Sequence, residues 1–170
     1  MNVTERVRQG QLLVCYCDFD GVTHDDAVYR APRIGIYMLT PGRRLFEWLP
    51  ILEDLLAPYP DVKIVLSTSW VRVRGFQFAK RQLTTSLQSR VIGATFHNRE
   101  TPKSEFDNMP RGMQICADVG RRRPARWFAI DNDDQGWPAW CRDQLIKTDD
   151  RLGLSDIRVQ ETIRKVLASF

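Results

Sequence analysis

The chain has 170 residues, of which 43% are hydrophobic and 27% are charged, and its formal net charge is +4. This length suits one domain with a sizeable core, and the balance of apolar and charged residues excludes a disordered or fibrous chain. No apolar run approaches the roughly 20 residues that cross a bilayer. The polar start MNVTERVRQGQ also lacks the apolar core of a secretory signal. We therefore expect a single domain over residues 1–170 that is cytoplasmic and does not contact a membrane.

Apolar runs typical of buried strands alternate with helical patterns along the chain. The predicted strands cover residues 12–17, 62–66, 91–96, 126–130 and 143–148. The predicted helices cover residues 50–58, 76–87, 110–122 and 155–168, the last beginning with Ser155 as a cap-like residue. Residues 21–44 have no clear period, and we expect a loop or hairpin there, over the site. The alternation predicts an α/β fold in which a doubly wound, Rossmann-like parallel sheet forms the middle of three layers.

Three of the predicted strands end in polar residues. Their sequences are Asp18-Phe19-Asp20-Gly21, Ser67-Thr68-Ser69-Trp70 and Asp131-Asn132-Asp133-Asp134. Ligands of doubly wound sheets bind beyond the carboxyl ends of the strands, so we expect the three groups to converge at one edge. Converging carboxylates repel one another unless a cation lies between them, and oxygen ligands at a partly open site suit Mg²⁺. The sequence therefore predicts a magnesium site at this edge.

These residue types also suit the transfer of a phosphoryl group. Asp18 is placed to be a nucleophile, and Asp20 is placed to act on the leaving group or on an attacking water. Gly21 lets the backbone approach phosphate oxygens, and the Ser67 hydroxyl can donate to another oxygen. Ordinary structural roles are the alternatives: an Asp-x-Asp-Gly turn for the two acids, a helix cap for Ser67 and a surface position for Arg111. The matching ends of the other two strands disfavour the simple turn.

The residues resemble a known family at this point. Asp18-Phe19-Asp20-Gly21-Val22, Ser67 after Val62 to Leu66, Arg111, and Asp131 after an apolar strand are similar to the four motifs of the haloacid dehalogenase-like (HAD) phosphohydrolases. More narrowly, CDFDGVTH, VLSTSW and FAIDND resemble the small HAD phosphatase domain found in bacteria, alone or in multi-domain RNA repair proteins. The resemblance covers about residues 12–140, and the strand and helix predicted over 143–168 follow it.

The resemblance implies a role for each matched residue. Asp18 would form an aspartyl-phosphate, and Asp20 would protonate the leaving oxygen and then activate water. Ser67 would bind the phosphoryl group, with Thr68 as the alternative. Asp131 would hold Mg²⁺ together with Asp18 and the backbone carbonyl of Asp20.

The basic and the fourth motifs leave two questions open. Arg111, at the start of the predicted helix 110–122, suits the cation of the third motif, and Lys103 is the alternative. Relatives often carry two adjacent acids at the fourth motif, whereas Asn132 follows Asp131 here. Asn132 could still accept a hydrogen bond from a metal-bound water, so we count it among the metal-site residues.

We expect a Mg²⁺-dependent phosphomonoesterase without a large cap domain, because the segments on either side of the second strand are short. An open site suits a large phosphorylated substrate such as a nucleic-acid end. A cluster of arginines could contact nucleic acid, or could simply be the solvated end of a helix; its members are Arg121, Arg122, Arg123 and Arg126. The alternatives are a binding module that keeps the fold without turnover, and a different reaction at the same nucleophile.

Other polar and aromatic residues receive structural interpretations. The four cysteines show no C-x-x-C spacing and are expected to be reduced packing residues. We expect His24 and His97 to be ordinary loop residues. Core or rim positions are expected for Trp70, Trp127, Trp137 and Trp140.

Overall fold

The computed structural model describes residues 12–97 and 102–170 of the chain. Its centre is a five-stranded sheet with the order β5-β4-β1-β6-β7, in which every neighbouring pair is parallel. The strands are β1 (Leu13–Cys17), β4 (Val62–Leu66), β5 (Val91–Ala94), β6 (Arg126–Asp131) and β7 (Leu145–Lys147). The chain builds β4 and β5 on one side of β1 and then β6 and β7 on the other. The sheet is therefore doubly wound, as the sequence predicts.

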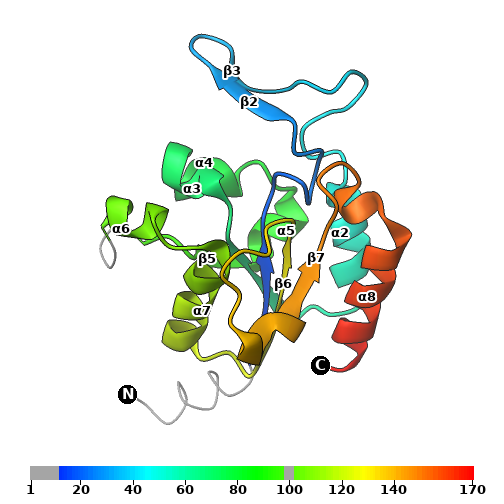
Figure 1. Ribbon diagram of the computed structural model, residues 1–170. Coiled ribbons are helices and arrows are strands. Elements are labelled where there is room, and N and C mark those ends of the chain that lie inside the picture. Colours follow the sequence, from blue (N-terminus) through cyan, green and yellow to red (C-terminus); the bar gives the residue numbers. More distant parts are fainter. Residues whose placement is uncertain (1–11, 98–101) are drawn as a thin grey trace.

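Helices cover both faces of this sheet (Figure 1). They are α2 (Leu49–Leu56), α3 (Ser69–Arg74), α4 (Phe76–Lys80), α5 (Thr85–Arg90), α6 (Lys103–Asp107), α7 (Arg111–Arg122) and α8 (Ile157–Ala168), with short 3-10 helices η1 (Ala139–Gln144) and η2 (Gly153–Ser155). Cys15 and Ile64 belong to the core shared with α2 and α8, whereas Val14 and Tyr16 pack with Ile115 of α7 on the other face. Both faces are covered, which explains why the strands read as continuous apolar runs. Within the described ranges no helix is long and apolar enough to cross a membrane.

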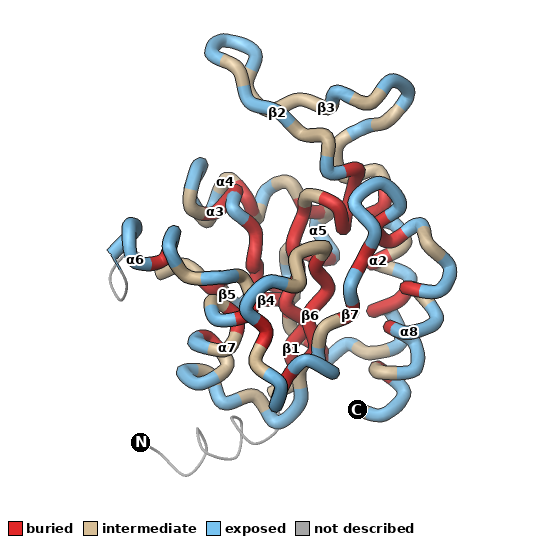
Figure 2. Tube along the Cα trace, in the orientation of Figure 1, coloured by how far each residue is buried: buried red, intermediate tan, exposed pale blue. Residues whose placement is uncertain are grey.

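A hairpin stands beyond the carboxyl edge of the sheet (Figure 1). It consists of β2 (Val28–Ala31) and β3 (Gly35–Met38), which pair antiparallel. Its residues are intermediate or exposed, whereas buried residues concentrate in the sheet and on the inner sides of the helices (Figure 2). The expectation of a loop or hairpin over the site is confirmed. No inserted cap domain covers this edge in the part of the chain that the structure describes.

The helix predicted over residues 76–87 is wrong, because the chain forms two helices, α4 and α5, in this region. Thr84 has extended backbone angles, and its side chain accepts from the Leu87 N–H as the N-cap of α5. A threonine hydroxyl that caps a helix in this way starts a new helix instead of continuing the previous one. Helices α3 and α6 were not predicted from the sequence either, because each is too short to show a period.

The predicted ends of other elements also shift. The N-cap of α8 is Asp156, whose carboxylate accepts from the Arg158 N–H, while the Ser155 hydroxyl donates to the Leu152 carbonyl. Strand β7 is shorter than predicted because residues 139–144 form η1. Boundary shifts of this kind follow from local capping and turn contacts, which an apolar period does not reveal.

The cysteines and tryptophans behave largely as packing residues. All four cysteines are free, and Cys15, Cys17 and Cys141 are buried. Trp127 stacks on Trp137 with 6.4 Å between ring centroids. Trp140 is 71% exposed and lies at the rim. Trp70 is buried as well, but it has a further contact at the site described below.

Candidate active site

Sheet register brings the three predicted strand ends together. Cys17 is level with Leu66 of β4 and with Ile130 of β6, so the next residues, Asp18, Ser67 and Asp131, lie side by side on adjacent strands. Backbone bonds continue the register by one residue: the Ser67 N–H donates to the Cys17 carbonyl at 3.0 Å, and the Asp18 N–H to the Ile130 carbonyl at 3.2 Å. Parallel pairing with this register is therefore what places residues from distant parts of the sequence at one site.

Arg111 reaches this site from the first turn of α7. Its Nη2 lies 3.3 Å from Asp18 Oδ2, and its Nε lies 3.2 Å from Asp131 Oδ2. Its Nη1 donates to the backbone carbonyl of Ser67. Pro110 at the N-cap starts the helix here, and its packing against Gly136 holds this helix end near the loop after β6. One guanidinium thus contacts all three strand ends and offsets part of the charge of the two carboxylates.

Burial changes the acidity of these groups. Burial raises the pKa of Asp18, an effect that Arg111 opposes and the charge of Asp20 reinforces. The pKa of Asp131 is raised well above its ordinary value by burial and by the Asp18 charge, in spite of Arg111. Burial lowers the pKa of Arg111, but the two carboxylates outweigh this and raise it. The site therefore holds two buried acids with only one described cation in contact with both, and a further cation or a bound proton would stabilise it.

Ser67 and Thr68 have different surroundings. Thr68 is the N-cap of α3, and its hydroxyl accepts from the Trp70 N–H at 3.3 Å. The Ser67 hydroxyl is buried and has no hydrogen-bond partner among the described residues. An unpartnered buried hydroxyl is rare, and it indicates a partner that binds from outside the chain. The helix-cap interpretation belongs to Thr68, and the Ser67 hydroxyl stays free to contact a phosphoryl oxygen.

Position 21 needs a glycine for two reasons, its backbone conformation and the closeness of Asn132. Its φ is +70°, and a Cβ built on it would lie 2.5 Å from the amide nitrogen of Asn132. That amide donates to Asp150 Oδ1 at 2.9 Å, and the Gly21 carbonyl accepts from the Thr148 hydroxyl at 2.7 Å. Asn132 thus ties the loop after β6 to the loop after β7. The next residue after Asn132 is Asp133, whose backbone N–H donates to Asp131 Oδ1 at 2.9 Å.

Asp20 is held by two nitrogen donors. His24 Nε2 lies 3.0 Å from Asp20 Oδ1, and the Trp70 indole N–H lies 3.0 and 3.1 Å from the two carboxylate oxygens. The Phe46 N–H donates to His24 Nδ1, so we assign the ring proton to Nε2, which then donates to Asp20. His24 is fully buried, whereas the side chain of Asp20 is 24% exposed. The expectation that His24 is an ordinary loop residue is wrong, because its ring fixes the orientation of Asp20.

The alternative cation Lys103 and the predicted arginine cluster lie elsewhere. Lys103, at the start of α6, lines a separate hollow with Val71 and Phe96, so of these two cations it is Arg111 that contacts the acids. Arg121 and Arg122 of the predicted arginine cluster pair with buried Asp118 at 2.5 and 2.6 Å. Both arginine side chains therefore contact a buried residue of α7, the helix that carries them. Arg126 begins β6 at the opposite edge of the sheet and donates to the Ser169 carbonyl. Arg123 ends α7 in a left-handed conformation.

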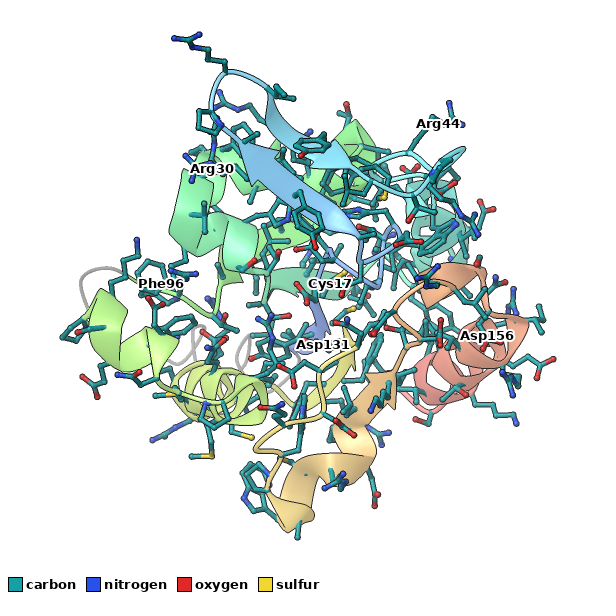
Figure 3. All side chains as sticks on the ribbon, turned by 45° about the horizontal axis from the view of Figure 1, so that its top comes forward. Cys17, Arg30, Arg44, Phe96, Asp131 and Asp156 are labelled. Atoms are coloured by element: carbon teal, nitrogen blue, oxygen red, sulfur yellow. The ribbon has the colours of Figure 1, made fainter. Side chains whose placement is uncertain are left out.

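A hollow of about 470 Å³ opens beside Arg111. Thr68, Arg111 and Asp133 are among the residues that line it, together with residues of α6. It gives an outside ligand access to the helix end that carries the guanidinium. Figure 3 shows the same region from above the carboxyl edge, with Cys17 and Asp131 labelled at the strand ends.

The oxygen atoms at the site suit a hard cation. Among the described residues, no group of three or more His, Cys, Asp or Glu side chains could hold a metal ion. Mg²⁺ is commonly bound by only one or two carboxylates, with water and substrate oxygens completing its coordination. Asp18 and Asp131 are two such carboxylates, and buried Asp131 Oδ2 forms the ion pair with Arg111 Nε but accepts no hydrogen bond from the described residues. The donor set therefore fits Mg²⁺, and it does not fit a metal that requires a full cage of protein ligands.

Sequence reasoning missed three residues of this site: His24, Trp70 as a donor, and Asp133. His24 follows Asp20 by four residues, a spacing that could have indicated the contact. The contact between Trp70 and Asp20 joins residues 50 positions apart, and no local sequence pattern predicts it. Asp133 lies in the polar group after β6, and its charge contributes to the raised pKa of Arg111.

Comparison with known proteins identifies the family of this chain. Neither the curated proteins nor the solved structures that were searched give a match. The family model described as "HAD domain in Swiss Army Knife RNA repair proteins" matches residues 14–159, which include all of the strand ends discussed above. The chain therefore belongs to this family of HAD domains, within the HAD-type hydrolase superfamily.

Proposed function

We propose that this HAD domain is a Mg²⁺-dependent phosphomonoesterase that acts through an aspartyl-phosphate on Asp18. The observation that carries the proposal is the level register of Asp18, Ser67 and Asp131, with Arg111 in contact with both acids and with the Ser67 carbonyl. A nucleophile, a hydroxyl donor and a cation within one site form the set that phosphoryl transfer needs.

In the first step, a carboxylate oxygen of Asp18 forms a bond to phosphorus, and the bond from phosphorus to the ester oxygen breaks. The Phe19 N–H donates to Asp18 Oδ1 at 2.8 Å and orients the nucleophile. Ser67 and Arg111 contact the phosphoryl oxygens, and Asp20 gives its proton to the leaving oxygen. Bound Mg²⁺, held by Asp18, Asp131 and the Asp20 carbonyl, would neutralise phosphoryl charge.

In the second step, Asp20 takes a proton from water, and the water oxygen attacks phosphorus and releases phosphate from Asp18. The N–H donors of His24 and Trp70 stabilise the carboxylate form of Asp20, which the first step produces and the second step requires. The substrate we favour is a phosphate at the end of a large polyanion such as nucleic acid. The family description and the absence of a cap over the described site support this choice.

The test is phosphate release from an aryl phosphate with Mg²⁺ and with EDTA. Asp18→Asn should reduce release by roughly a thousandfold or more, because it removes the nucleophile. Asp134→Asn is the matched control, since this half-exposed acid lies three residues after Asp131 and, among the described residues, forms its ion pairs with Arg142 and Lys147. Release that survives in Asp18→Asn, or that does not depend on the metal, would refute the mechanism. Absence of release in every protein, together with retained nucleic-acid binding, would favour a binding module without turnover.

A further inference from the structure

The hairpin beyond the site carries positive charge and no acid. Between Ala27 and Phe46 the sequence contains Arg30, Arg33, Arg43 and Arg44 but neither Asp nor Glu. Arg30 and Arg33 are exposed, and no acid of the described residues pairs with them, whereas Arg43 lies 3.7 Å from Glu47. Unpaired arginines on a projecting segment do not stabilise the fold, so they are available to an anionic ligand.

The hairpin arginines are connected to Asp20 by a continuous surface. A hollow of about 140 Å³ is lined by Asp20, Trp70, Tyr29 and Arg30, among others. A second hollow, of about 650 Å³, is lined by residues 30–35 of the hairpin and by Arg74 of α3. Arg30 borders both hollows, so the surface runs from Asp20 along the hairpin. In Figure 3, Arg30 lies on the hairpin above the strand ends labelled at Cys17 and Asp131.

An exposed aromatic side chain also lies on this surface. Tyr29 is 56% exposed and borders the hollow that contains Asp20. Arg74 is exposed as well, and its guanidinium lies 4.5 Å from the ring centroid of Phe78, which fixes its position on α3. Arginines that follow a backbone, together with an exposed aromatic ring, are the means by which proteins bind single-stranded nucleic acid. A carboxylate-rich peptide would use the arginines but not the ring.

We infer that the hairpin and α3 bind a single-stranded nucleic acid whose terminal phosphate occupies the site at Asp18. Arg30, Arg33 and Arg74 contact backbone phosphates, and Tyr29 stacks on a base near the terminus. This inference rests on the proposed function and names its substrate-binding surface. It also moves the nucleic-acid contact from the cluster at Arg121–Arg126, where Arg121 and Arg122 pair with Asp118, to the hairpin and α3.

The inference is tested by binding in the Asp18→Asn background, where the substrate is not consumed. The probe is a labelled single-stranded RNA of about 10 nucleotides with a terminal phosphate, and its affinity is measured by fluorescence anisotropy between about 50 and 200 mM salt. Adding Arg30→Gln, Arg33→Gln and Arg74→Gln should weaken binding roughly tenfold or more. It should also reduce the slope of log K against log salt by about 2, for three lost phosphate contacts. Tyr29→Ala should weaken binding roughly tenfold without changing the slope, and Tyr29→Phe should restore it.

The matched control removes the same charge from α8 through Arg158→Gln, Arg164→Gln and Lys165→Gln, all exposed. This variant should keep both the affinity and the salt slope. An equal loss in the α8 variant would overturn the inference, because net charge alone would then explain binding. Binding of a polyglutamate peptide as tight as that of the RNA would also overturn it. Because Asp18→Asn is used throughout, a wild type that releases no phosphate would refute the proposed function and leave this result intact.

Discussion

At the scale of single residues, the site depends on positions with little freedom. Gly21 has to adopt a positive φ and also leaves room for the Asn132 amide. His24 has one nitrogen fixed by the Phe46 N–H, which leaves the other to donate to Asp20. Arg111 contacts three strand ends at once. Each of these residues is fixed by a contact from another part of the chain, and each would tolerate substitution poorly.

Gly21→Ala should lower the free energy of unfolding by about 2–4 kcal/mol, from backbone strain and from the overlap of the new Cβ with Asn132. Gly42→Ala is the control, because Gly42 also has a positive φ, of +78°, but has no neighbouring atom within 4 Å of a Cβ. This variant should lose only about 1 kcal/mol. Urea unfolding measures both. Equal losses would show that Asn132 moves aside and that the close approach has no energetic importance.

At the scale of elements, helix α3 and the loop after β1 together orient Asp20. Thr68 caps α3 and so fixes the start of the helix that carries Trp70. The Trp70 ring packs edge to face against Phe19 and Phe46, which keeps its indole N–H directed at Asp20. The orientation of Asp20 therefore depends on α3 and the loop after β1 staying docked against each other.

Trp70→Phe should lower kcat/KM for phosphate release, because the ring packing remains while the donor to Asp20 is lost. We expect a loss of roughly tenfold to a hundredfold, within the range that general acid–base catalysis contributes. The loss should be larger for an alkyl phosphate than for a nitrophenyl phosphate, whose leaving group hardly needs a proton. Trp48→Phe is the control, since this equally buried tryptophan forms no hydrogen bond to Asp20 in the described structure. A loss independent of the leaving group would show that Trp70 has only a packing role.

At the scale of the whole molecule, acids gather at the edge of the sheet that carries the site. Buried Asp18 and Asp131 have raised pKa values, and the pKa of exposed Asp26 is raised to about 6 by partial burial and by Asp150, Asp20 and neighbouring acids. A raised carboxyl pKa means that the folded protein holds protons which the unfolded chain releases. Without metal, this edge therefore destabilises the fold increasingly as pH rises from about 4 to above 6.

Asp26→Asn should raise the melting temperature in EDTA at pH 7, because it removes a charge from this group of acids. The gain over wild type should be absent near pH 4, should grow up to about pH 6 and should then stay constant. Asp134→Asn should instead lower the melting temperature by an amount that changes little from about pH 5 to 7 and shrinks only at lower pH, because the hydrogen bond from Lys147 lowers the pKa of Asp134 and the ionised form favours folding. Thermal unfolding across this pH range decides the matter. A gain from Asp26→Asn that did not vary with pH would contradict the assigned cause.

The sequence by itself determined the α/β architecture, because a strand buried on both faces has to be apolar throughout. It also determined the principal acids of the site: Asp18, Asp20 and Asp131 interrupt or follow apolar runs where a strand must end, and acids cannot remain inside such a strand. Ser67 was identified as a candidate for the same reason of position, and Arg111 was identified through the resemblance to the HAD motifs. Helix ends and the short helices α3 and α6 could not be derived, because they depend on individual caps such as Thr68 and Asp156.

Only the tertiary structure decided which cation meets the acids and which groups hold Asp20. The sequence favoured Arg111 and left Lys103 as the alternative, and in the structure the start of α7 brings Arg111 to Asp18 while α6 directs Lys103 to another hollow. Likewise, the arginines at 121 and 122 became structural once Asp118 was found buried beneath them. The physical reason is that these hydrogen bonds and ion pairs join residues distant in sequence. A hydrophobic period or a sequence motif reflects only contacts between residues that are close along the chain.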